Sequence, residues 1–188
     1  DLAKILPPEH SSLSSNLNRI PAVTCVVVNL EYPGKQDIPQ GFGVLLPAME
    51  DGPVLGVVFD SCTFPDHDRK DQDCTRLTLM LGGHWYDELK DRVGSMDEES
   101  LSSFSCSTIE RLLKITDKPN KVIVSIQKDC IPQYYVGHSQ MVDDMFDYIK
   151  DNQLPLTLIG NSYKGVAVND CILNAKIGAE RVLDSLQK

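Results

Sequence analysis

The sequence is poor in basic residues and has no long hydrophobic run. Its 188 residues include 18 Lys and Arg against 27 Asp and Glu, which leaves a formal net charge of −9. A surface that binds nucleic acid needs a basic patch, so this composition argues against a nucleic-acid partner. No apolar run approaches the roughly 18 residues that a membrane-spanning helix requires. The sequence therefore predicts no membrane-spanning segment.

Cysteine and histidine are present, but not at the spacings of a metal or redox site. The six cysteines lie at positions 25, 62, 74, 106, 130 and 171, and the four histidines are scattered. No cysteine pair has the spacing of a zinc finger or a Cys-x-x-Cys motif. A chain of this length can bury a real core, so a disulfide framework is not expected. We expect no metal site.

The larger, N-terminal part of the chain is predicted to form an antiparallel or mixed sheet. Short apolar or alternating runs between turn residues are typical of strands, and the β-branched run at 23–28 predicts a central strand. The expected strands are residues 22–30, 41–46, 54–59, 77–81 and 121–127.

Two amphipathic helices are predicted to accompany the sheet. Ser95-Met96-Asp97-Glu98 fits a capping box and predicts a helix that starts at this point. Apolar residues at helical spacing predict a second helix over about residues 138–151. Strands and helices together indicate an α/β (mixed α+β) fold class.

Residues 154–186 are predicted to form a strand, a glycine-bounded loop and a helix. The run at 154–159 is short and apolar enough for a buried strand, and Gly160 and Gly165 bound the loop. A helix start presents free backbone N–H groups and partial positive charge, so an anionic group would be stabilised there. An ordinary strand-to-helix connection looks the same, which leaves both interpretations open. The apolar face of the helix comprises Val168, Cys171, Ile172, Ala175, Ala179, Val182, Leu183 and Leu186.

The stretch LTLIGNSYKGVAVNDCI at 156–172 resembles the C-terminal signature of the protoporphyrinogen oxidase family, within the amine-oxidase-like flavoproteins. Three more stretches are similar to the same family in the same order: QGFG at 40–43, RLTLMLGG at 76–83 and IPQYYVGH at 131–138. The family's Gly-x-Gly-x-x-Gly dinucleotide fingerprint is not in this sequence. We therefore expect a C-terminal fragment, or a piece whose N-terminal half is encoded elsewhere.

The resemblance implies an oxygen-dependent FAD enzyme that oxidises protoporphyrinogen IX to protoporphyrin IX in haem biosynthesis. It implies FAD contacts, mostly through backbone groups, at Asn161, Val166, Ala167 and Val168. It implies porphyrinogen contacts at Phe42, Gly43, Leu45 and Met80. Without the resemblance, the porphyrinogen set would be interpreted as ordinary strand core, because large apolar residues are usually just buried. No catalytic side chain is identified, since the hydride chemistry belongs to the cofactor.

His138 has two interpretations. It could act as a general base, or it could begin a helix with its ring satisfied by a backbone group. We favour the second, because flavin chemistry demands no acid–base pair at this position.

The family resemblance also implies a domain division and a cellular context. We expect residues 1–130 to be the C-terminal half of a substrate-binding domain, and residues 131–188 to be the return segment of an FAD-binding domain. The full-length protein would be a homodimer at the mitochondrial inner membrane, held there by segments absent from this chain. Oxygen would be its electron acceptor.

Two other functions remain open. One is another enzyme of the superfamily, such as an amine oxidase or a carotenoid-desaturase-like protein. An amine oxidase needs an aromatic cage, for which Tyr134 and Tyr163 are candidates, but the stretches around Phe42 and Met80 disfavour it. The other is a non-catalytic binding or interaction fragment without FAD, which the missing glycine fingerprint favours.

Overall fold

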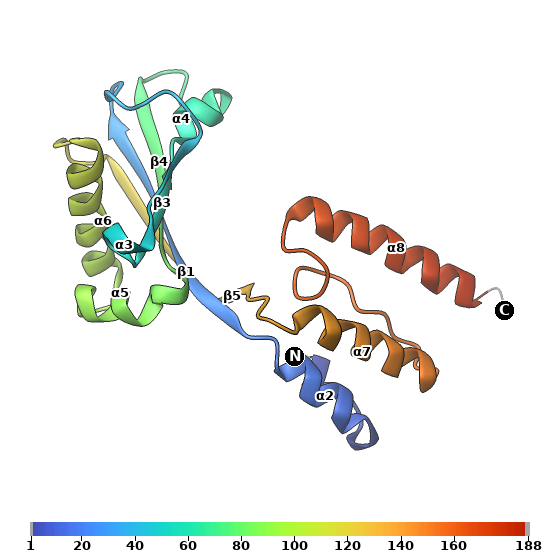
Figure 1. The fold of residues 1–188 in the computed structure, drawn as a ribbon. Coiled ribbons are helices and arrows are strands. Elements are labelled where there is room, and N and C mark those ends of the chain that lie inside the picture. The colour runs from blue at the N-terminus through green and yellow to red at the C-terminus, as the bar shows by residue number, and fades with distance from the viewer. Residues whose placement is uncertain (1, 187–188) are drawn as a thin grey trace. The chain divides into compact units, whose positions relative to one another are not determined.

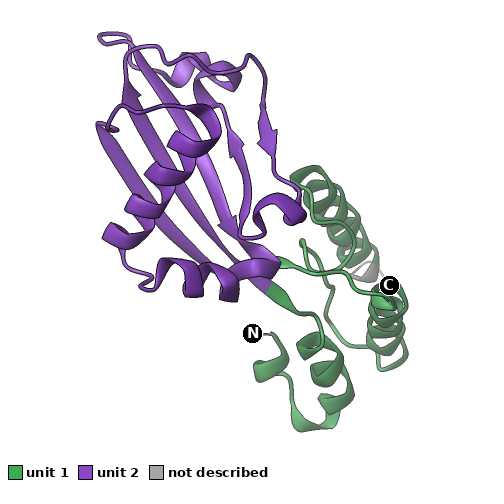
Figure 2. Ribbon diagram, turned by 60° about the vertical axis from the view of Figure 1, so that its left-hand side comes forward, with its two compact units in different colours: residues 1–22, 131–188 green, residues 23–130 purple. Residues whose placement is uncertain are grey.

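The computed structural model describes residues 2–186, which form two compact units (Figures 1 and 2). The sheet unit is Val23–Cys130, and the helical unit combines the residues up to Ala22 with those from Ile131 onward. We expected residues 1–130 to stay together, but the described residues before Val23 group with the helical unit instead. The reason is that Leu13, which is 1% exposed, is buried in one cluster with Met145.

The sheet unit is built on five strands in the order β2-β3-β4-β1-β5. β1 pairs with β4, and β3 pairs with both β2 and β4, all antiparallel. Every strand predicted in this unit is present, and β1 lies inside the sheet as its apolar run predicted. The strands are β1 (Ala22–Pro33), β2 (Gly43–Leu45), β3 (Val54–Val58), β4 (Cys74–Gly82) and β5 (Lys121–Pro132).

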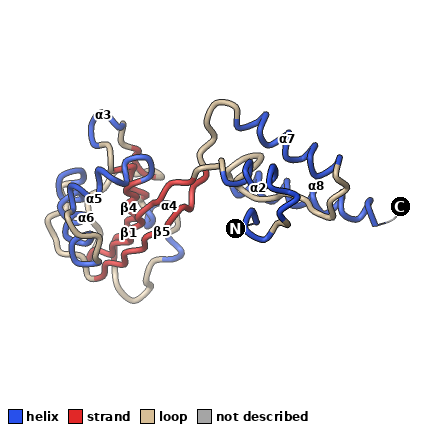
Figure 3. Tube along the Cα trace, turned by 90° about the horizontal axis from the view of Figure 1, so that it is seen from below, coloured by secondary structure: helices blue, strands red, loops and turns tan. Residues whose placement is uncertain are grey.

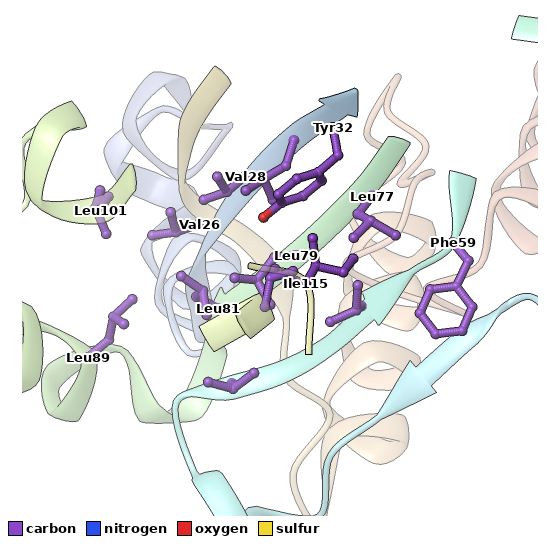
Figure 4. Close-up of a cluster of buried hydrophobic side chains, with 14 residues drawn as sticks. Val26, Val28, Tyr32, Phe59, Leu77, Leu79, Leu81, Leu89, Leu101 and Ile115 are labelled. Atoms are coloured by element: carbon purple, nitrogen blue, oxygen red, sulfur yellow. The ribbon is translucent and has the colours of Figure 1, made fainter. Parts of the chain in front are cut away.

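One face of this sheet is buried beneath two helices, α5 (Tyr86–Val93) and α6 (Glu98–Leu113). Leu89 of α5 and Leu101 of α6 are fully buried in the same cluster as Leu79 of β4 (Figure 4). Alternate residues point to opposite faces of a strand, which explains why every second residue of β1 and β4 joins this core. Those residues are Val26, Val28, Leu30, Tyr32, Leu77, Leu79 and Leu81.

The start of α6 differs from the prediction. Asp97, rather than Ser95, is the N-cap, and its carboxylate accepts the Ser100 N–H at 2.8 Å. The Ser95 hydroxyl donates to the same carboxylate. These two hydrogen bonds, that of Ser95 first, lower the pKa of Asp97. An aspartate two residues further along therefore takes the role that the Ser-x-x-Glu spacing assigned to the serine.

The helical unit contains short N-terminal helices and two long ones. α7 (His138–Asp151) has the predicted bounds, and α8 (Val168–Leu186) follows the glycine-bounded loop. Among residues 2–186, no helix is both long and apolar enough to cross a membrane. The short elements of the chain are α1 (Leu2–Ile5), η1 (Pro8–His10), α2 (Ser11–Asn18), α3 (Ala48–Asp51), α4 (Asp60–Thr63), η2 (Pro65–His67) and η3 (Gly83–Trp85).

The predicted strand at 154–159 is not a strand in the structure, and Figure 3 draws this segment as loop. The Leu154 N–H donates to the Ile149 carbonyl at 2.9 Å, and the Leu156 N–H donates to the Leu154 carbonyl at 2.8 Å. A strand is defined by the ladder it forms with a neighbour. No described strand pairs with this segment, so its apolar pattern alone does not make it one.

The predicted apolar face of α8 is turned outward. Val168 is 74% exposed and Ile172 is 64% exposed. The helix packs on its own unit through Gly178, where an added Cβ would lie 2.7 Å from Cγ2 of Ile159. Leu186, the last member of the predicted face, has its side chain outside the described part of the structure.

We expect Leu79→Ala to destabilise the sheet unit by about 2–5 kcal/mol, because Leu79 is fully buried and the change leaves a cavity. Urea denaturation of the chain measures the difference in the free energy of unfolding. The control is Ile123→Ala on β5, where the side chain is 48% exposed and the expected loss is within about 0.5 kcal/mol. Equal losses for the two variants would contradict this core assignment.

Candidate functional site

The glycine loop, residues 160–167, connects the extended segment to α8. Gly160 and Gly165 have φ values of 112° and 108°, a region that L-residues with side chains rarely adopt. At Gly165 an added Cβ would also lie 2.5 Å from the Asp170 side chain, whereas nothing lies within 4 Å of one at Gly160. The backbone at Gly160 is therefore open to close approach by a ligand.

The loop ends on the exposed start of α8. The Ala167 carbonyl accepts the Cys171 N–H at 3.0 Å, and the Asp170 carboxylate accepts the Ala167 N–H at 3.3 Å. Asp170 thus caps the helix while complementing its dipole. The first-turn N–H groups of α8 have no acceptor within the helix, and Val166 and Val168 are 53% and 74% exposed. The predicted FAD-contacting residues at 166–168 therefore lie together at an accessible helix start.

The side chains of Tyr134 and His138 contact the backbone of this loop. The Tyr134 hydroxyl donates to the Asn161 carbonyl at 2.6 Å and accepts the Gly165 N–H at 3.1 Å. Its ring stacks on that of His138, with centroids 3.7 Å apart and planes 13° from parallel. His138 is 7% exposed and its Nε2 lies 3.0 Å from the Tyr163 carbonyl. His138 is thus the first residue of α7 with its ring bound to a backbone group, as the second interpretation predicted.

The outer side of the loop makes separate contacts that are largely exposed to solvent. Lys164 Nζ pairs with Asp143 at 2.9 Å and lies 5.0 Å from the Phe146 ring centroid. The Asn174 side-chain amide donates to the Lys164 carbonyl at 2.6 Å. Burial raises the pKa of Tyr163, which keeps its phenol neutral.

Three of the four predicted porphyrinogen-contacting residues share one face of the sheet. Leu45 lies opposite Gly56, and Gly56 lies opposite Met80. Directly opposed residues of antiparallel strands point to the same face, and Gly43 shares it because it is two residues from Leu45. This face is the one opposite α5 and α6, since Leu79, next to Met80, points into the core.

Gly43 is constrained by the pairing of β2 with β3. An added Cβ would collide with the Val57 carbonyl oxygen, and one at Gly56 would lie 2.5 Å from the Val44 carbonyl oxygen. Backbone atoms of β3 fill the space beside Gly43. Gly43 could therefore contact a ligand only through its own backbone. Phe42, by contrast, is 69% exposed, and its carbonyl accepts the Phe59 N–H at 2.9 Å. Its ring is available as contact area.

Sequence reasoning missed a polar cluster on the same face as Met80. Thr78 Oγ1 lies 2.9 Å from Asn29 Oδ1 and 2.7 Å from Asp60 Oδ2. The signal was present, because Thr78 and Met80 alternate with three leucines in β4 and must point away from the core. It also missed the loop-holding role of Tyr134, for which a single sequence carries no signal. Within residues 2–186, no group of three His, Cys, Asp or Glu side chains could hold a metal ion.

With this geometry in place, comparison with known proteins defines the class. Residues 2–183 match the family described as flavin containing amine oxidoreductase, and the chain belongs to that family. Over 182 residues it is 41% identical to a Bos taurus protein named protoporphyrinogen oxidase, covering 97% of this chain and 38% of that protein. It is also 29% identical over 89 residues to a Staphylococcus aureus protein named coproporphyrinogen III oxidase, covering 47% of this chain and 19% of that one.

The fold has a counterpart among solved structures. A protein from Exiguobacterium sp. 255-15, provisionally assigned as a protoporphyrinogen oxidase, superimposes with a TM-score of 0.74 at 21% identity. The match covers 93% of this chain and 37% of that one. This likeness confirms the predicted mixed α/β fold. The chain spans less than half the length of these relatives.

We expect Gly165→Ala to destabilise the helical unit more than Gly160→Ala. Both variants place a side chain at positive φ, which costs about 1–2 kcal/mol, but only the first also displaces Asp170 from the start of α8. Urea denaturation measures the cost, and amide exchange over residues 166–171 reports whether the helix start frays. Equal costs and unchanged exchange in both variants would contradict the packing described at Gly165.

Proposed function

We propose that this chain is the C-terminal part of an oxygen-dependent FAD enzyme that oxidises protoporphyrinogen IX to protoporphyrin IX. The observation that carries the proposal is the identity of 41% to a protoporphyrinogen oxidase over 97% of the chain. The four family-like stretches all fall inside that span. Identity of this extent supports a shared substrate class better than fold likeness does, because one fold hosts many functions.

The glycine loop fits the flavin end of FAD. Asn161, Val166, Ala167 and Val168 would hold it, largely through backbone, at the open approach beside Gly160. When bound, the flavin supplies hydride acceptance, and its reduced form carries negative charge near N1. The N–H groups at the start of α8 would stabilise that charge without reorganising. No side chain of this chain is required to transfer a proton.

The open face of the sheet fits a flat macrocycle. Phe42, Leu45 and Met80 offer apolar contact area of the kind that large planar ligands require, and Leu45 and Phe42 are 80% and 69% exposed. The polar cluster around Thr78 would supply hydrogen bonds beside this apolar surface. We assign the sheet unit to the substrate-binding domain of the whole enzyme.

We assign the helical unit to the FAD-binding domain, because residues 154–159 are placed like one strand of an open α/β sheet. On one side, Leu158 is buried with Met145 and Ile149 of α7. On the other, Gly178 of α8 packs against Ile159 and Thr157. Helices on both faces of a strand are the mark of a parallel sheet.

A groove of about 530 Å³ runs beside this segment and is lined by Phe146 and Ile149 of α7 and Arg181 of α8. A neighbouring strand laid there would complete the backbone hydrogen bonds of the segment. In the whole enzyme, we expect that strand to come from the part of the FAD-binding domain that this chain does not contain.

The family resemblance also suggests the oligomeric state, the location and the electron acceptor of the whole enzyme. We propose a homodimeric full-length enzyme at the mitochondrial inner membrane, associated with the membrane through segments outside this chain, with oxygen as electron acceptor.

A rival amine oxidase would need Tyr134 free beside the flavin. Its hydroxyl is already engaged by Asn161 and Gly165, which disfavours that alternative.

The test of the function is oxidation of porphyrinogens by the natural protein that contains this chain. We expect aerobic conversion of protoporphyrinogen IX, followed by porphyrin fluorescence, to be faster than that of coproporphyrinogen III. Met80→Ala should raise KM for protoporphyrinogen roughly tenfold, since about 1–3 kcal/mol accompanies lost apolar pocket contacts. The matched control is Met49→Ala on α3, where the side chain is fully exposed. Oxidation of amines, or of neither porphyrinogen, would contradict the proposal.

The domain assignment makes a separate prediction for amide exchange. In this chain expressed alone, the N–H groups of residues 157–159 should exchange rapidly, because no described strand pairs with them. In the natural protein they should be protected by several orders of magnitude, as in the interior of a stable sheet. Rapid exchange in the natural protein would show that the segment is not part of a sheet.

A further inference from the structure

We propose that Tyr134 and His138 are positioning residues that hold the glycine loop in the conformation that receives the flavin. The inference rests on the proposed function and adds two residues to it. Neither residue belongs to the loop, yet together they contact the backbone of Asn161, Tyr163 and Gly165.

The Tyr134 hydroxyl closes the loop across its width. It donates to the Asn161 carbonyl at 2.6 Å and accepts the Gly165 N–H at 3.1 Å. One phenol thus joins two backbone groups that are four residues apart, next to glycines that would otherwise visit many conformations. A phenol carries one donor hydrogen and accepts through oxygen, so this pairing uses its donor and one acceptor position.

His138 fixes the position of the tyrosine ring. The two rings stack at 3.7 Å with planes 13° from parallel, and His138 is 7% exposed. The Tyr163 carbonyl, 3.0 Å from Nε2, can only accept. Nε2 therefore carries a hydrogen, and the ring orientation is set. The His138 N–H also donates to the Tyr135 carbonyl at 2.9 Å, which anchors the residue at the start of α7.

These contacts already use the protons that the two side chains could donate. The single proton of the Tyr134 hydroxyl and the Nε2 proton of His138 are both committed to backbone carbonyls. Their effect on the flavin would be indirect, through the direction in which the loop aims the N–H groups at 166–168. A displaced loop would stabilise the anionic reduced flavin less, so the flavin potential would fall.

The test uses the full-length flavoenzyme that contains this chain. Tyr134→Phe keeps the ring but removes both loop hydrogen bonds, and His138→Gln keeps a donor but removes the stack. We expect each to weaken FAD binding about tenfold and to lower the two-electron flavin potential by about 30 mV, which corresponds to a tenfold change for this couple. KM for the porphyrinogen should be unchanged.

Two controls separate positioning from general stability. Tyr135→Phe alters the neighbouring tyrosine, which is 59% exposed. Asp143→Asn removes the exposed ion pair to Lys164 on the outer side of the loop, and such pairs contribute little. Both should leave the potential at the wild-type value. Amide exchange at Gly165 should rise in Tyr134→Phe and stay unchanged in both controls.

The outcomes distinguish this proposal from the function on which it rests. If Tyr134→Phe only lowers the melting temperature, with the flavin potential and FAD affinity of wild type, the positioning role is overturned and the function stands. If the wild-type protein carries no flavin, the proposed function fails and the positioning role toward flavin fails with it. In that case, unchanged amide exchange at Gly165 in Tyr134→Phe would also show that the Tyr134 hydroxyl does not hold the loop.

Discussion

Backbone hydrogen bonding is the constraint on which the helical unit depends. Residues 154–159 are covered on one side by Met145 and Ile149 and on the other by Gly178, yet no described strand pairs with them. Peptide groups that are shielded from water need hydrogen-bond partners, so we propose that another strand lies beside this segment in the whole protein. The exposed apolar face of α8 fits the same proposal. Both features fit a chain that spans 38% of the Bos taurus relative.

Within each unit, rigid elements present the groups that matter for chemistry. In the helical unit, α7 supplies His138, whose ring supports Tyr134 beneath the glycine loop, and the loop leads to the exposed start of α8. In the sheet unit, the packing of Leu79 and its neighbours beneath α5 and α6 leaves Met80 on the opposite, accessible face. A protein contributes binding, orientation and electrostatics to flavin chemistry, and the roles that we propose for both surfaces are of that kind.

Sequence patterns predicted the sheet unit well because its strands carry their own periodicity. Leu77, Leu79 and Leu81 alternate with half-buried residues, and β1 and β4 both bury such a face. The segment at 154–159 failed as a strand because an apolar pattern does not supply a partner. The apolar stripe of α8 was identified correctly, but its exposure could not be predicted, because a sequence pattern does not show what covers a helix face. The contacts of Tyr134 could not be predicted, since they join residues about 30 positions apart through backbone atoms.

The central claim is that this chain is one part of a flavoprotein. The most direct measurement is the intact mass and flavin content of the natural polypeptide that contains it, purified without denaturant. We predict a polypeptide of more than twice 20.9 kDa that carries one non-covalent FAD. A polypeptide of 20.9 kDa that retains no flavin, alone or with a partner, would contradict the account.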